Sequence, residues 1–170
     1  MQLATVQGIS RQTQLVSRFF QSSMPTNDCI FVQLSSHRRY IGAIFTTGGQ
    51  LLSVCLKVSH GAQDDDPDVH TFFPNGATSN RLTSMPSTRL RLLHDWRVIF
   101  TCSMAPTPDN FAIQALYGRR WYGNIIVLKY SRENHNSIIS VTSADLEFVI
   151  ALVGMYTFFS LALHRRIKSS

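Results

Sequence analysis

The stretch TSADLEFVIALVGMYTFFSLALHRRIKSS, residues 142–170, decides the class of the whole chain. Its residues 148–163 carry no charge, and they separate two acidic residues from a basic end. A helix that is apolar on all sides fits either a bilayer or a deeply buried position in a soluble core. Thr142 or Ser143 can cap such a helix, so we expect it over residues 144–166, followed by a basic tail.

One interpretation of this helix is attachment to an intracellular membrane. The uncharged run spans about 24 Å at 1.5 Å per residue, which is short of the roughly 30 Å of hydrocarbon in a bilayer. A spanning anchor therefore requires the domain to give up its last helix, whereas packing across a sheet does not. The sequence leaves both interpretations open. The side chains expected to meet the membrane are Phe148, Leu152, Met155, Phe158, Phe159, Leu161, Arg165, Arg166 and Lys168.

Composition narrows the class of protein and its partners. The 170 residues suffice for one domain with a buried core, and a hydrophobic share of 44% argues against global disorder. The net charge of +6 attracts anionic partners, which can be membrane lipid, nucleic acid or an acidic protein. Three widely spaced cysteines without C-x-x-C match neither a disulfide framework nor a zinc pattern. Because the sequence also shows no glycosylation sequon and no secretory signal, we expect an intracellular location, cytoplasmic or membrane-associated.

The N-terminal residues 1–28 form a flexible or amphipathic segment. Its first 27 residues contain no acid, are rich in Ser, Thr and Gln, and include Arg11 and Arg18. Mitochondrial targeting segments share this composition, and so do ordinary disordered termini. Both alternatives remain.

Residues 29–143 have the pattern of an α+β domain. The glycines at 48–49 supply the positive φ of a hairpin turn between two apolar runs. A helix is expected over 108–117, with Thr107 as its N-cap and Gly118 after its end. We therefore predict a small, mostly antiparallel sheet with this capped helix and the C-terminal apolar helix. Strands are expected at 29–34, 40–45, 51–58, 96–102, 124–130 and 137–141, with a long polar loop over 59–87.

The long polar loop carries the residues most suited to a divalent metal. Three of its aspartates match the first ligand positions of a calcium loop, but Val69 stands where Gly is needed and Asn75 where the bidentate Glu belongs. The alternative is a solvated acidic loop. The candidate metal ligands are His60, Asp64, Asp66, Asp68 and His70.

The segment after the expected short helix is the densest basic and aromatic cluster in the chain. Arg119, Arg120, Trp121 and Tyr122 can hold a phosphate and stack a base, and Lys129 follows in the next expected strand. Equally, arginines at a helix C-terminus complement its dipole, and two aromatic rings can cover a sheet edge. The cluster is a candidate anion or nucleic-acid site with a structural alternative.

Evidence for catalysis is sparse. No phosphate-binding loop, nucleophile elbow or zinc-protease motif is present, so no catalytic residue, cofactor or small-molecule substrate is indicated. The adjacent His94 and Asp95 can serve proton transfer or metal binding only with further partners, and local hydrogen bonding at an element end is the commoner role of such residues. An enzyme is therefore the least favoured class, after a membrane-attached interaction protein and a soluble basic binding domain.

Several stretches together resemble a group of fungal proteins. These are NRLTSMPSTRLRLLHDWRVIF, then the capped helix, then RRWYGNIIVLKYSR and SVTSADLEFVIALVG. The pattern is similar to the C-terminal part of small uncharacterised proteins predicted from mushroom-forming (basidiomycete) fungi, over about residues 73–154. The resemblance implies no activity. Here the stretch MYTFFSLALHRRIKSS extends the pattern.

Overall fold

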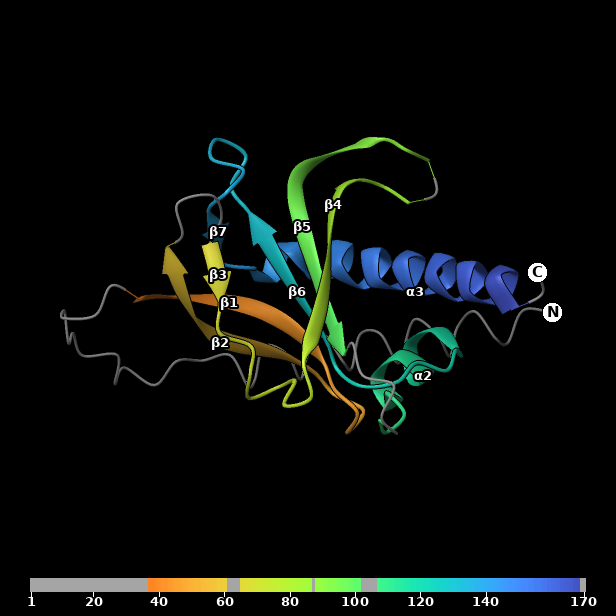
Figure 1. Cartoon of the computed structure of the whole chain (residues 1–170). Helices are drawn as coiled ribbons and strands as arrows, with labels where there is room; N and C mark the ends of the chain where they lie inside the picture. The colour runs from red at the N-terminus through yellow and green to blue at the C-terminus, as the bar shows by residue number, and fades with distance from the viewer. Residues whose placement is uncertain (1–36, 61–64, 87, 102–106, 169–170) are drawn as a thin grey trace.

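The computed structural model describes residues 37–60, 65–86, 88–101 and 107–168, and within 161–168 and at residues 37 and 60 it describes the backbone alone. The described chain forms one antiparallel sheet and two α-helices, which confirms the α+β class (Figure 1). The expected strand over 29–34 and the N-terminal segment lie outside these residues. The elements are β1 (His37–Phe45), β2 (Leu51–His60), β3 (Asp65–Pro67), β4 (Ala77–Ser84), β5 (Arg91–Thr101), α2 (Phe111–Tyr117), β6 (Ile125–Tyr130), β7 (Ile138–Ile139), the short 3-10 helix η1 (Ser143–Asp145) and α3 (Leu146–Lys168).

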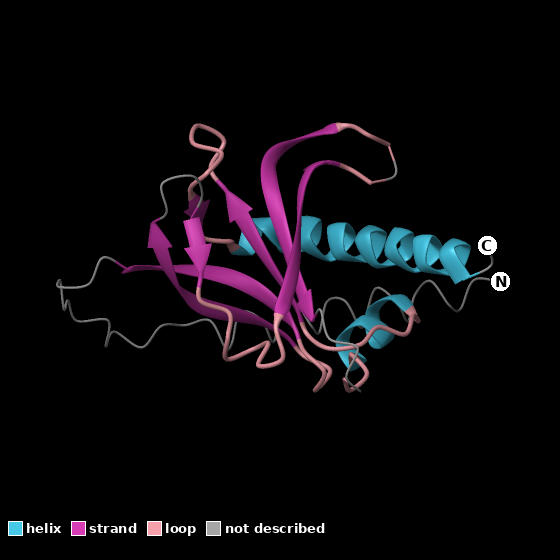
Figure 2. Ribbon diagram, in the orientation of Figure 1, coloured by secondary structure: helices cyan, strands magenta, loops and turns pink. Residues whose placement is uncertain are grey.

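The strands form a single curled sheet in the order β3-β2-β1-β6-β5-β4, with β7 paired to β6 (Figure 2). β1 and β2 make the predicted hairpin, in which Phe45 pairs with Leu51 and Gly49 adopts a φ of 84° at the turn. β4 and β5 make a second hairpin, and β6 joins the two hairpins by pairing with both β1 and β5. The three strands β1, β6 and β5 therefore form the centre of the sheet, and the remaining strands pair with them or extend it on either side.

The two faces of the sheet bury different cores. One face, with Trp96, Val98 and Val127, packs against α3 and α2. The opposite face, with Ile99 and Leu128, packs against the segment after β3. Side chains of a strand alternate between faces, so neighbours along β5 belong to different cores.

The short helix begins later than predicted. The structure places its first residue at Phe111, with Asn110 and not Thr107 as the N-cap. Buried Asn110 accepts from the backbone N–H of Ile113 (3.0 Å), and its amide donates to the carbonyls of Phe45 (2.9 Å) and Gly123 (2.7 Å). One asparagine thus caps α2 and ties it to the sheet, a role that a threonine hydroxyl cannot fill. Gly118 ends the helix at φ 64°, as predicted.

The C-terminal helix is preceded by a capping box. The backbone N–H and the hydroxyl of Thr142 both donate to the Asp145 carboxylate (2.9 and 2.7 Å), and α3 then continues to Lys168. Its first three turns lie in the core beside the sheet, where the most buried side chains are Leu146, Val149, Leu152, Val153 and Thr157.

The prediction of one long polar loop over residues 59–87 is wrong in part, because this stretch contains the strands β3 and β4. β4 has the sequence ATSNRLTS, without the alternation of apolar residues that marks a strand. It forms the outer edge of the sheet, where a strand needs a partner on one side only and polar residues are favoured.

Candidate functional site

Arg119 serves the packing of the two helices. Its guanidinium donates to the carbonyl of Gly154 on α3 (3.2 Å) and lies 4.3 Å from the ring centre of Phe158. Beside it, the hydroxyl of Tyr117 donates to the carbonyl of Ile150 (2.6 Å), and burial raises the pKa of that hydroxyl. The ring of Tyr117 lies so close to Gly154 that a Cβ there would meet it at 2.8 Å. The junction of α2 and α3 is therefore tight, and Arg119 is part of it.

Arg120 is also engaged within the chain. Its Nε and Nη2 bind both carboxylate oxygens of Asp109 at 3.0 and 3.2 Å, and this hydrogen-bonded ion pair raises the arginine's pKa. Trp121 packs edge-on against Phe100, and within the described part of the chain its buried Nε1–H has no hydrogen-bond partner. Only Tyr122 leaves its ring largely exposed.

Lys129 does not join this segment. Its ammonium lies 2.7 Å from the carboxylate of Asp145, at the start of α3, and both side chains are nearly buried. Asp145 ends η1, whereas Arg119 contacts Gly154 on α3, nine residues further along the chain. The structure therefore separates Lys129 from the other four residues proposed for anion or nucleic-acid binding, and it gives Arg119, Arg120 and Lys129 protein partners.

The proposed metal ligands are only partly brought together. Asp66, Asp68 and His70 line a hollow of about 680 Å³ on the β2–β3 side, but Lys57 lines it too. The Asp68 carboxylate accepts from the backbone N–H of His70 (3.3 Å). Within the described residues no three acidic, histidine or cysteine side chains are grouped so as to hold a metal ion. Asp64 lies outside the described residues, and for His60 only the backbone in β2 is described.

The residues proposed for membrane contact divide along α3. Leu152 is fully buried and Phe148 stacks at 5.2 Å on Trp96 of the sheet, so both belong to the domain core. Met155, Phe158 and Phe159 instead line a shallow apolar groove of about 590 Å³. For Leu161, Arg165, Arg166 and Lys168 the structure describes a helical backbone only.

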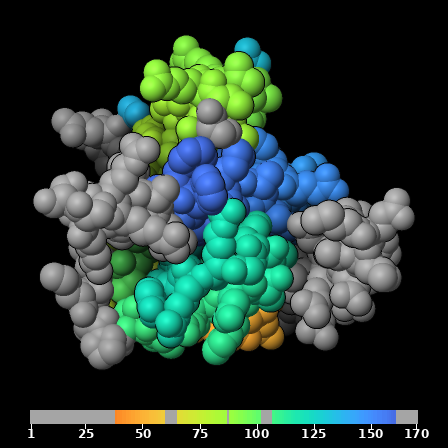
Figure 3. Space-filling view, turned by 90° about the vertical axis from the view of Figure 1, so that its right-hand side faces the viewer, coloured from red at the N-terminus to blue at the C-terminus, as the bar shows by residue number. Residues whose placement is uncertain are grey.

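This apolar groove lies between α2 and α3. Its other lining residues are Tyr117 and Arg119 from the α2 side and Ala151 and Gly154 from α3. The two helices lie side by side on this surface, which Figure 3 views from the right-hand side of Figure 1. The ring of Phe158 is 50% exposed and meets Phe159 edge-on at 5.3 Å. The groove is thus an apolar surface bordered by the cation of Arg119.

By length and composition, one helical stretch of the described chain, Ser143–Ser160, could cross a membrane. Core helices of soluble proteins often meet the same criterion, and this stretch supplies much of the core that covers one sheet face. Composition therefore does not decide between the two environments.

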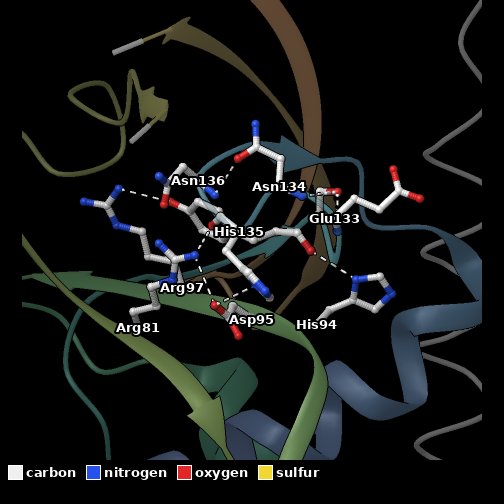
Figure 4. Close-up of polar contacts among 10 residues, drawn as sticks. Arg81, His94, Asp95, Arg97, Glu133, Asn134, His135 and Asn136 are labelled. Carbon is white, nitrogen blue, oxygen red and sulfur yellow. Dashed lines mark hydrogen bonds and ion pairs between the residues drawn. The ribbon is translucent and has the colours of Figure 1, made fainter. Parts of the chain in front are cut away.

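A polar cluster joins residues of β4, β5 and the β6–β7 turn (Figure 4). Of these residues the sequence indicated only Asp95, as the neighbour of His94. The buried carboxylate of Asp95 lies 3.1 Å from Nη2 of Arg81 and 3.4 Å from Nδ1 of His135. Arg81 also donates to the backbone carbonyl of His135 and stacks 4.3 Å from the ring centre of Tyr130.

The histidine adjacent to Asp95 in sequence is not its partner. His94 points to the other side of β5, where its Nδ1 lies 3.1 Å from the carbonyl oxygen of Tyr130. Strand alternation separates His94 from Asp95, so they form no dyad, and the turn residue His135 takes that position.

Comparison with protein-family models, curated proteins and solved structures found no match to the chain. The resemblance to basidiomycete proteins over residues 73–154 accordingly stays a prediction.

Proposed function

We propose that the chain is a small non-enzymatic interaction protein, intracellular, that attaches to an anionic membrane through the outer part of α3. The observation that carries the proposal is the apolar groove beside Arg119, with the half-exposed ring of Phe158 at its rim. An exposed apolar surface rimmed by a polar or charged group is the kind of surface that meets a membrane or a protein partner.

The proposed contact lies in the plane of the membrane surface. Withdrawing α3 into a bilayer would expose the apolar side chains that it covers on the sheet, among them Trp96, Val98, Ile125 and Val127. At about 1.5–3 kcal/mol for each such side chain, the loss is roughly 6–12 kcal/mol, similar to the whole stability of a typical domain. A helix that stays docked and presents one apolar side avoids that loss.

Charge favours an anionic bilayer as the partner. The chain carries +6, Arg119 borders the groove, and the sequence of α3 continues into Arg165, Arg166 and Lys168. Basic residues next to an apolar helical surface are typical of helices that lie at the headgroup level of anionic membranes. Nucleic-acid binding by the 119–122 segment receives less support, because Arg120 is neutralised by Asp109 and the ring of Trp121 packs against Phe100.

The test is flotation of the purified chain with vesicles of phosphatidylcholine alone or mixed with phosphatidylserine. We expect flotation with the anionic vesicles only, falling as salt is raised. Replacing Phe158 by Ser should lower the partition roughly fivefold, since about 1 kcal/mol of apolar contact is removed.

The chain offers a matched control for this experiment. Phe111 is 55% exposed but lies at the opposite end of α2 from the groove, so Phe111→Ser should float like the wild type. Equal flotation of the wild type with both kinds of vesicle, or equal losses in the two variants, would reject the proposal.

A further inference from the structure

Two arginines lie directly opposite each other on the sheet face away from α3. Arg81 on β4 pairs in register with Arg97 on β5, and like charges in that position destabilise a sheet. Among the described residues, the carboxylate of Asp95 binds Arg81 and His135. The described cluster thus holds two guanidinium groups, one carboxylate and one imidazole (Figure 4).

Arg97 is held in place by neutral groups. Its Nε donates to the hydroxyl of Ser79 (3.0 Å) and its Nη1 to the hydroxyl of Tyr130 (3.3 Å). Across the part of the chain that the structure describes, no carboxylate lies within 4.0 Å of this guanidinium. The two hydroxyls fix its orientation and leave its charge uncompensated, although the side chain is partly buried.

A guanidinium fixed by neutral hydroxyls keeps its charge and its remaining Nη donors for an anion. Such donors, held in one plane, suit contact with an oxyanion. His135, half exposed at the rim and oriented by Asp95, adds a further hydrogen-bonding nitrogen. Two guanidinium groups and an imidazole offer N–H donors from several directions, which suits the three oxygens of a phosphate better than the two of a carboxylate.

We propose that this sheet face binds the phosphate group of a small soluble molecule. Arg97 makes the principal contact, and Arg81 and His135 flank it. The cluster lies on the face opposite to the one that α3 covers, so a membrane held by α3 does not present its headgroups to it.

The probe is inorganic phosphate, titrated by calorimetry into the full chain at constant ionic strength with chloride as the reference. We expect saturable binding of phosphate and none of chloride. Replacing Arg97 by Gln should abolish the saturable heat. Arg132→Gln is the control, because this exposed arginine lies in the nearby β6–β7 turn and makes no hydrogen bond or ion pair within the described chain. Its affinity should equal that of the wild type.

A second variant keeps the test decisive if Arg97→Gln fails to fold. His135 is half exposed, so His135→Gln should leave the fold intact and weaken phosphate binding severalfold. Binding of chloride as strong as phosphate, full affinity in a folded Arg97→Gln, or unchanged affinity in His135→Gln would overturn the site. Arg97→Gln should still float with anionic vesicles like the wild type, and a loss of flotation would overturn the assignment to a soluble ligand.

Discussion

The ion pair between Lys129 and Asp145 gives the sharpest stability prediction. The two side chains are only 11% and 15% exposed, and Nζ lies 2.7 Å from Oδ1. Asp145→Asn removes the charge but keeps an oxygen that can accept from the backbone N–H of Thr142, which the carboxylate now binds at 2.9 Å. The variant leaves a nearly buried ammonium without its partner, so we expect a loss of about 3 kcal/mol in the free energy of unfolding.

The pH dependence of this loss has a definite sign. Burial alone would raise the pKa of Asp145, but hydrogen bonds from Lys129 and Thr142 outweigh it and lower the pKa below the ordinary 3.8. A carboxyl whose folded pKa is depressed stabilises fully above its unfolded pKa and loses that contribution as pH falls through the folded value. The gap between wild type and Asp145→Asn should therefore stay constant near neutral pH and shrink below about pH 4.

Urea unfolding of both proteins over a pH series measures this gap. Asp109→Asn is the control, because its partner Arg120 is largely exposed and the change should hardly alter stability. A difference under about 1 kcal/mol at neutral pH, or one that does not change on acidification, would refute the assigned role of the pair.

Four further substitutions test how α2, α3 and the turn before β6 are held. Asn110→Ala should lower the free energy of unfolding by about 3 kcal/mol, measured in urea. The change removes the N-cap of α2 and two buried hydrogen bonds that the side-chain amide donates. Leu152→Ala should lower the free energy of unfolding by about 3 kcal/mol, because the side chain of Leu152 is fully buried. Phe158→Ala should change that free energy by under 1 kcal/mol, because Phe158 is half exposed. Gly123→Ala should lower the melting temperature by several degrees, since Gly123 has φ 74° and a Cβ there would lie 2.4 Å from the Thr101 hydroxyl oxygen.

Local signals in the sequence predicted the elements that local physics determines. Thr142 is followed three residues later by an acid, which is sufficient to mark the start of the last helix. Gly118 marks the end of α2, and the glycines of the 46–50 turn predict the first hairpin. Each of these depends on neighbours within about five residues.

The polar partners could not be predicted, because they come from distant parts of the fold. The partner of Arg119 is a backbone carbonyl 35 residues away, and Asp95 pairs with a histidine on another turn and not with its sequence neighbour. The strand β4 was not predicted, because an edge strand buries little apolar surface and does not need an alternating apolar pattern. A basic and aromatic sequence therefore says little about binding until its internal partners are known.

Fractionation of cells that express the full chain tests the central claim most directly. The proposed attachment by a docked α3 places the chain in the membrane fraction at low salt, and predicts its complete release by alkaline carbonate. Retention in the carbonate-washed pellet would show a spanning helix and contradict the account. Recovery in the soluble fraction without any treatment would contradict membrane attachment itself.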